Sequence, residues 1–149
     1  MIQSAATKYA IRALCHLAGS RVEGRPVPAK EIAGRLEIPY HFLSKILQEL
    51  ARKGILESVK GPGGGFRLLR PPEETSLYDL VTMVEGPVSE TECMLGLEFC
   101  EDEPPCPMHA FWERHRSLFR SKMESVSLVD LARTAEGRRE TGAVVEMVE

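Results

Sequence analysis

The sequence predicts a mainly α-helical protein that carries one small β-hairpin, and two observations predict this fold class. Apolar residues recur at helical spacing in several segments, which Gly and Pro residues separate. Residues 55–59 and 66–69 instead mix apolar and polar positions as β-strands do, and they flank the glycine-rich residues 60–65. The hairpin is therefore expected directly after a helical N-terminal stretch.

Two helices are expected before residue 37. The first spans residues 4–19 and ends at a glycine, and Cys15 within it is expected to be a small core residue. Its apolar face consists of Ala6, Ala10, Ala13, Leu14, Leu17 and Ala18. A turn-rich stretch follows, and Pro28 then suits the first turn of a short second helix. The inward positions of this second helix are Ile32, Ala33 and Leu36.

A tight turn at residues 37–38 leads into a longer third helix, which runs from Pro39 to about Lys53 and is capped by Gly54. Its apolar face is formed by Phe42, Leu43, Ile46, Leu47 and Leu50. The hairpin comes next, and Pro71 and Pro72 end the unit. Residues 1–72 are therefore expected to form one domain.

Three more helices are expected in the rest of the chain, over residues 76–85, 107–125 and 128–135. A polar loop without Lys or Arg, residues 86–105, separates the first two of these helices. The long helix over residues 107–125 carries an apolar stripe made of Met108, Phe111, Trp112, Leu118, Phe119 and Met123. Residues 73–135 are expected to form a second unit, and residues 136–149 a flexible tail.

Composition and charge limit the classes of function. The 149 residues contain no apolar run long enough to span a membrane and no secretory leader pattern, so a cytoplasmic protein without a membrane partner is expected. The net charge of −3 is divided unevenly, since residues 1–70 carry +7 and residues 71–149 carry −10. A basic N-terminal half is typical of a domain that binds a polyanion.

The predicted order of elements is that of a winged helix-turn-helix, a fold that binds double-stranded DNA. In this fold the N-terminal end of the third helix enters the major groove and exposes polar side chains there. The expected contacts on this helix are Tyr40, His41, Ser44, Lys45 and Gln48. At the wing, a glycine-rich backbone can approach phosphates or the minor groove closely. The expected contacts there are Lys60, Gly61, Gly63, Gly64 and Gly65.

Four strings in this part of the chain resemble the Rrf2 family of bacterial transcriptional regulators: residues 7–10, 32–33, 42–47 and 59–66. The resemblance covers about residues 1–135 and is most specific in the wing string. It implies further DNA contacts from Thr7, Lys8 and Tyr9 in the first helix. It also implies a homodimer in which the long C-terminal helices of the two subunits cross. The interface residues would be Phe111, Trp112, Leu118, Phe119 and Met123.

Three of the four cysteines cluster in the pattern C-x6-C-x5-C-x2-H, made of Cys93, Cys100, Cys106 and His109. In a reducing compartment, this clustering indicates metal or redox chemistry rather than a structural disulfide. Zinc sites usually contain a close C-x2–4-C pair, which is missing here, whereas iron–sulfur clusters accept wider loops. The pattern favours an iron–sulfur cluster over zinc.

The cysteine pattern is similar to that of the cluster-binding members of the Rrf2 family, although the first gap is one residue longer than the commoner family gap. The resemblance implies that all four residues of the pattern are cluster ligands. Other members take a carboxylate from the first helix as the fourth ligand, but the corresponding residue here is Lys8, which cannot ligate as a cation. This difference favours His109 as the fourth ligand, and a [2Fe-2S] cluster over a [4Fe-4S] cluster.

The expected function is a regulator whose cluster senses iron–sulfur status, redox state or nitric oxide and thereby modulates operator binding. One alternative is a cluster-free regulator of the same family that uses zinc or cysteine-thiol chemistry. Another is an iron–sulfur electron carrier or a cysteine enzyme. Nothing else in the sequence favours an enzyme or a small-molecule substrate, since it has no phosphate-binding loop, paired catalytic carboxylates or cofactor fingerprint.

Overall fold

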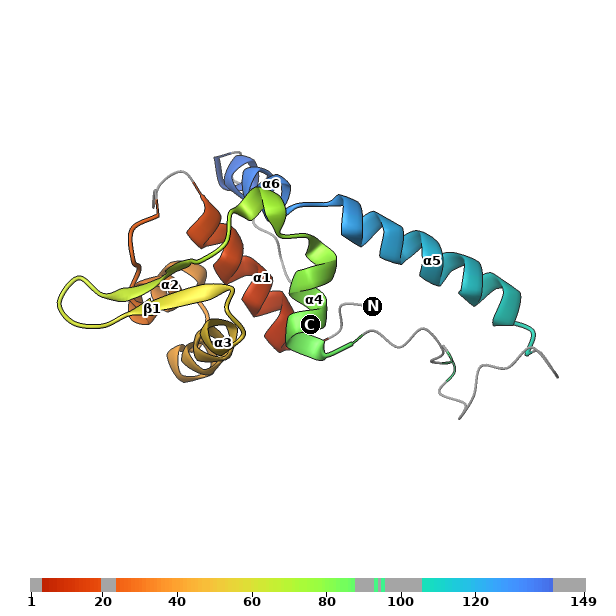
Figure 1. Cartoon of the computed structure of the whole chain (residues 1–149), viewed down its shortest axis with the longest axis horizontal. Helices are drawn as coiled ribbons and strands as arrows, with labels where there is room; N and C mark the ends of the chain where they lie inside the picture. The colour runs from red at the N-terminus through yellow and green to blue at the C-terminus, as the bar shows by residue number, and fades with distance from the viewer. Residues whose placement is uncertain (1–3, 20–23, 88–92, 94, 96–105, 141–149) are drawn as a thin grey trace.

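The structure is a computed structural model that describes residues 4–19, 24–87, 93, 95 and 106–140. It confirms the mainly helical fold with one small hairpin (Figure 1). The elements, in chain order, are α1 (Ala5–Ala18), α2 (Ala29–Leu36), α3 (Tyr40–Arg52), β1 (Leu56–Val59), β2 (Gly65–Leu68), the 3-10 turn η1 (Pro72–Glu74), α4 (Leu77–Glu85), α5 (His109–Ser125) and α6 (Leu128–Glu140). A search of the described helices finds none that is long and apolar enough to cross a membrane.

The helix ends follow the local sequence signals. Ser4 is the N-cap of α1, and its hydroxyl oxygen accepts a hydrogen bond from the amide of Thr7 at 3.1 Å. The tight turn between α2 and α3 is made by Glu37, which adopts the left-handed conformation with φ 54° at the end of α2. This turn is short enough to hold the two helices against each other, as a helix-turn-helix requires.

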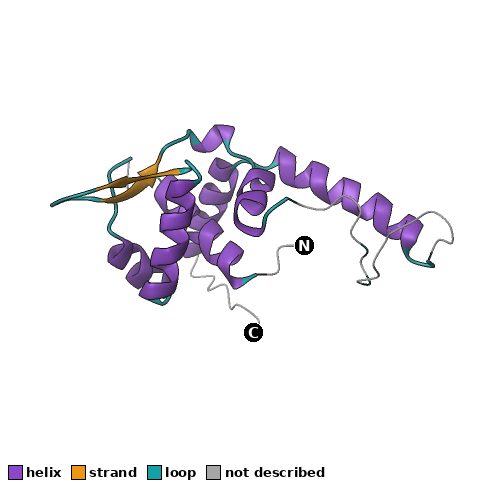
Figure 2. Ribbon diagram, turned by 60° about the horizontal axis from the view of Figure 1, so that its bottom comes forward, coloured by secondary structure: helices purple, strands orange, loops and turns teal. Residues whose placement is uncertain are grey.

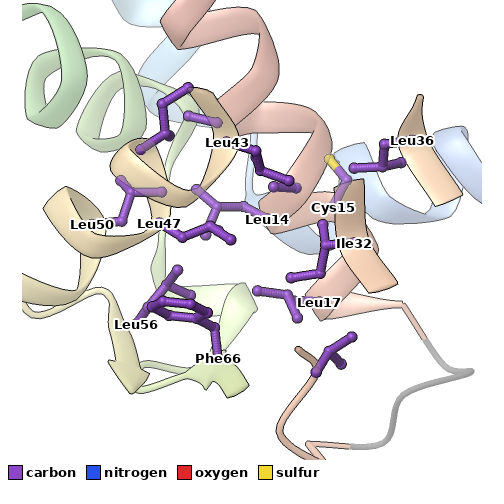
Figure 3. Packing of buried hydrophobic residues seen from close by; sticks show 14 of the residues in the cluster. Leu14, Cys15, Leu17, Ile32, Leu36, Leu43, Leu47, Leu50, Leu56 and Phe66 are labelled. Carbon is purple, nitrogen blue, oxygen red and sulfur yellow. The ribbon is translucent and has the colours of Figure 1, made fainter. Parts of the chain in front are cut away.

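The hydrophobic core is built around α1, which lies between the other elements of the body. Leu14 on α1 and Leu43 and Leu47 on α3 are fully buried, and Figure 3 shows them close together. Cys15 is also buried among apolar side chains, as expected. The core extends beyond the N-terminal elements, because Leu80 of α4 and Leu128 of α6 belong to the same cluster. Leu14, Leu43 and Leu47 lie on the apolar faces that helical periodicity predicts for the first and third helices.

The two-stranded wing carries an additional pairing that joins it to the segment before α2. β1 and β2 are antiparallel, with Glu57 opposite Arg67 and Val59 opposite Gly65. On the other side of β2, Val27 and Phe66 exchange two backbone hydrogen bonds, of 2.9 and 2.8 Å. The base of the wing is therefore held from both sides of β2, although the hairpin alone has only two strands.

The starts of α4 and α6 lie side by side and are built alike. Ser76 and Ser127 form an antiparallel bridge, and each accepts a hydrogen bond from the amide of an aspartate three residues on, Asp79 or Asp130. The hydroxyl and amide of Ser127 in turn donate to Asp130, and these hydrogen bonds lower the pKa of its carboxyl group. Helix α6 runs to Glu140, so it continues past residue 135, where the sequence suggested that it ends.

Helix α5 projects away from the body on the side opposite the wing, in both Figure 1 and Figure 2. Its contacts with the rest of the chain are made mainly to α4. The side chains of Phe111, Leu118 and Phe119 are exposed along this helix. The molecule thus has a compact body, which contains the wing, and one projecting helix, α5, whose apolar side chains are only partly buried against that body.

Candidate nucleic-acid interface and metal ligands

The N-terminal half of α3 presents polar side chains to solvent. His41, Lys45 and Gln48 are exposed and Ser44 is half-buried, while Leu43 and Leu47 on the opposite face are buried. The N-cap residue is Pro39, which makes no side-chain cap to the helix. The first backbone amides of α3 are therefore available to a phosphate, which the helix N-terminus favours. This arrangement can hydrogen-bond both base edges and the DNA backbone.

Two aromatic rings border this polar face. Tyr40 is exposed on one flank, where the Lys30 ammonium lies 5.8 Å from the centre of its ring. Phe42 lies on the other flank and packs against Tyr9 of α1, with ring centroids 5.6 Å apart. The apolar pattern predicts Phe42 on the buried face of α3, and this prediction is wrong, since 41% of the residue is exposed. It lies at the edge of the apolar face, where Tyr9 covers only one side of its ring.

The sequence does not predict that Lys30 lies at this surface, because its proximity to Tyr40 depends on how α2 packs against α3.

One of the expected DNA contacts in α1 is corrected by the structure. Lys8 is exposed and Tyr9 half-buried, but Thr7 is 0% exposed, so its side chain cannot reach DNA. The Thr7 hydroxyl instead donates a 2.7 Å hydrogen bond to Oε1 of Glu85, which also accepts from the amide of Ser4 at 3.2 Å. Thr7 therefore joins the start of α1 to the end of α4, a role that only the long-range contact reveals.

The four wing glycines divide into two kinds. Gly61 and Gly63 are exposed at the tip, have φ values of 88° and 73°, and have open space where a Cβ would lie. Gly64 and Gly65 are half-buried, and a Cβ there would lie 2.2 Å from the carbonyl oxygen of Val59 or 2.3 Å from that of Val27. Packing of the wing backbone therefore requires glycine at the second pair, whatever the ligand.

The charged residues of the wing differ in their availability to DNA. Lys60 is exposed at the start of the tip. Arg67 on β2 forms a 2.7 Å ion pair with Glu57 on β1, and this hydrogen bond raises the pKa of the guanidinium group. Of these two cations, Lys60 is thus the one placed to meet the negative potential of a minor groove.

Two of the predicted metal ligands lie at the start of α5 or just before it, and Cys93 lies earlier in the chain. Cys93 is buried, Cys106 is half-buried in the turn that precedes α5, and His109 is the first residue of α5. The amide of His109 donates to the carbonyl oxygen of Cys106 at 3.0 Å, so these two residues share one turn. Cys100 lies outside the described residues. Within the described part of the chain, no three His, Cys, Asp or Glu side chains form a group that could hold a metal ion.

The apolar stripe of α5 is only partly available to a partner. Phe111, Leu118 and Phe119 are 50%, 63% and 44% exposed, and Trp112 is half-buried. Met123, which was expected at the interface, is 4% exposed and packs within its own chain, so this expectation is corrected. It lies near the end of α5 where the helix rejoins the body, and the apolar pattern alone could not distinguish that contact from one with a partner.

The three packed helices followed by a wing, with a basic and polar recognition helix, define a winged helix-turn-helix DNA-binding protein. Comparison with known families then identifies the group. The Rrf2 family, described as iron-dependent transcriptional regulators, matches residues 3–134. The chain belongs to the Rrf2 family of transcriptional regulators.

Individual relatives agree with this assignment. A putative HTH-type transcriptional regulator of Aquifex aeolicus is 33% identical over 138 residues, which cover 91% of this chain and 94% of the relative. The regulator IscR of Aliivibrio salmonicida is 33% identical over 124 residues, covering 83% and 73% of the two chains. Both relatives are named as HTH-type transcriptional regulators and not as enzymes.

Solved structures also share the fold. The structure of CymR, described as the global cysteine regulator of B. subtilis, has a TM-score of 0.73 at 26% identity, over 88% of this chain and 95% of that one. The structure of T. potens IscR has a TM-score of 0.70 at 23% identity, over 98% and 91% of the two chains, and supports the fold alone. The winged-helix architecture expected from the sequence is thereby confirmed.

Proposed function

We propose that this regulator binds operator DNA as a homodimer and holds an iron–sulfur cluster, of the [2Fe-2S] type, at Cys93, Cys100, Cys106 and His109. The cluster senses iron–sulfur status, redox state or nitric oxide and modulates operator binding. One observation carries the proposal: His109 is the first residue of α5 and Cys106 lies in the turn just before it, and this same helix exposes an apolar face. A change at the ligands therefore acts directly on the helix that meets the partner subunit.

The donor set fits an iron–sulfur cluster in its chemistry. Three thiolates and one imidazole match the ligands that such clusters use, and thiolates select iron–sulfur clusters or zinc. Helix α5 begins at His109, and the amide of His109 donates to the carbonyl oxygen of Cys106, so these two donors lie within one turn of the chain. Bound to these side chains, the cluster would supply electron-transfer or ligand-exchange chemistry with oxidants and nitric oxide. Its binding would also join the segment around Cys93 to the first turn of α5. The family description as iron-dependent regulators supports a role for iron.

The homodimer is supported by the exposed face of α5. Phe111, Leu118 and Phe119 recur at a spacing that places them on one side of the helix. The Phe111 ring stacks on the ring of His115, with centroids 3.8 Å apart, which extends this face along the helix. Because α5 projects from the body, two copies can pack along this helix and hold their recognition helices at a set spacing for two half-sites.

Replacing Leu118 with lysine is expected to weaken the dimer by about 100-fold or more, because an uncompensated charge in an apolar interface costs roughly 3–5 kcal/mol. Sedimentation equilibrium over a range of protein concentrations measures the change. Ser117→Lys is the matched control, since Ser117 is exposed on the same helix next to Leu118. Equal dimer affinity in the two variants, or a monomeric wild type, would contradict the interface.

The cluster is tested by anaerobic purification followed by visible absorbance and by assays of iron and acid-labile sulfide. The wild type is expected to be coloured and to contain about two iron atoms and two sulfides per chain. Cys106→Ala should lose both, and His109→Ala should keep the fold but change the spectrum. Ser117→Ala is the control, because Ser117 is exposed on the same helix and belongs neither to the cysteine pattern nor to the apolar face.

Each outcome of this experiment decides between named alternatives. A colourless protein that contains zinc, or reactive thiols without metal, would overturn the cluster in favour of the cluster-free regulator. An unchanged spectrum in His109→Ala would exclude His109 as a ligand. The sensing role requires that apo and cluster-bound protein differ in affinity for the same operator at the same salt concentration. Equal affinities would contradict that role even if the cluster is present.

A further inference from the structure

The exposed ring of Phe42 is an apolar group at the border of the polar surface of α3. Phe42 is the third residue of α3, close to the helix end that enters the major groove. Its neighbours on the exposed side of the helix, His41 and Lys45, are polar and solvent-exposed. The surface therefore combines hydrogen-bonding groups with one apolar contact group.

The position of this ring is held by α1. Phe42 and Tyr9 pack edge to face, at an interplanar angle of 82°. Tyr9 is contacted in turn by Arg12, whose guanidinium carbon lies 6.0 Å from the centre of the Tyr9 ring. Arg12 also donates a 2.5 Å hydrogen bond to the carbonyl oxygen of Leu36, at the end of α2. The Phe42 ring is thus backed on one side by a chain of contacts, and its other side faces solvent.

The major groove of B-DNA offers one apolar feature, the 5-methyl group of thymine, and phenylalanine is among the residues that contact it. The polar neighbours of Phe42 are suited to base edges and phosphates, whereas the Phe42 ring has no hydrogen-bonding atom and is suited to the methyl group. We propose that Phe42 is a specificity-determining residue, which contacts the 5-methyl group of a thymine in the operator. This inference rests on DNA binding by α3 and is independent of the cluster.

The test uses an operator selected from randomised duplexes with the full-length wild-type protein. Each thymine is replaced in turn by deoxyuridine, which lacks only the methyl group, and affinities are measured for the wild type and for Phe42→Ala at one salt concentration. At one thymine position the replacement is expected to weaken wild-type binding by about fourfold, the worth of one buried methyl group. The same replacement should leave Phe42→Ala binding unchanged.

Two further variants separate recognition from folding. Phe42→Leu keeps an apolar side chain and should retain part of the thymine-dependent difference, while Arg52→Ala, at the other end of α3, should retain all of it. Thermal unfolding of each variant establishes that it is folded. The proposal is overturned if no thymine position depends on residue 42, or if Phe42→Ala weakens every duplex, non-specific DNA included, by the same factor.

Discussion

Replacing Gly65 with alanine is expected to lower the free energy of unfolding by about 2–5 kcal/mol and to disrupt the wing. Gly65 has a φ of 147°, and an alanine Cβ there would lie 2.3 Å from the carbonyl carbon and oxygen of Val27. These are backbone atoms and cannot rotate away. Relief requires Val27 to move, which breaks its two hydrogen bonds with Phe66.

Urea unfolding measures the change in stability, and operator affinity measures the loss of the wing. Gly63→Ala is the matched control, because Gly63 also has a positive φ, of 73°, but has open space around its missing side chain. Its expected cost is about 1 kcal/mol, from the left-handed backbone alone. Equal destabilisation by the two substitutions would show that backbone conformation, and not the close approach to Val27, explains the glycine at position 65.

The second large effect is expected for Leu128→Ala, which should destabilise the chain by about 2–5 kcal/mol. Leu128 is the first residue of α6, is 0% exposed, and belongs to the same core as Leu14 and Leu47. Its removal leaves a cavity in the core that α1 shares with α6, and these two helices pack against each other. Val129→Ala is the control, because Val129 is half-buried on the same helix turn and should cost less than about 1 kcal/mol.

The Leu128 substitution also tests how residues 1–72 depend on the C-terminal helices. Since α4 and α6 complete the core around α1, the wing and α3 are expected to unfold together with α6 in a single transition. Circular dichroism should show one cooperative transition with a lowered midpoint, and amide hydrogen exchange should show the same loss of protection in α1, α3 and α6. An unchanged transition for the N-terminal helices in Leu128→Ala would mean that they fold independently of α6.

The local elements could be predicted from the sequence because their signals are local. Ser4 and Gly19 bound α1, and the turn residues around Glu37 separate α2 from α3. The polar positions of α3 follow from helical periodicity, which places His41, Lys45 and Gln48 opposite the buried leucines. The length of α6 was underestimated, since the charged residues 136–140 carry no apolar signal and their helix depends on continuation from a packed first turn.

The wrong predictions for individual residues of the candidate site share one cause. Periodicity shows which face of a helix is apolar or polar, but not which distant residues cover it. Thr7 was assigned to DNA and is covered by Glu85, and Met123 was assigned to a partner and is covered by its own chain. Phe42 was assigned to the core and is left half uncovered by Tyr9. Each outcome depends on a contact between segments far apart in the chain.

The sequence by itself determined the winged helix-turn-helix, the polar recognition face and the family, because capping residues, apolar periodicity and the wing string are local properties of the chain. Only the tertiary structure decided which glycines the wing requires, which of Thr7 and Lys8 reaches solvent, and how α6 joins the N-terminal core. The physical reason is that burial and close backbone approach arise when distant segments pack together, and a local pattern does not contain that information.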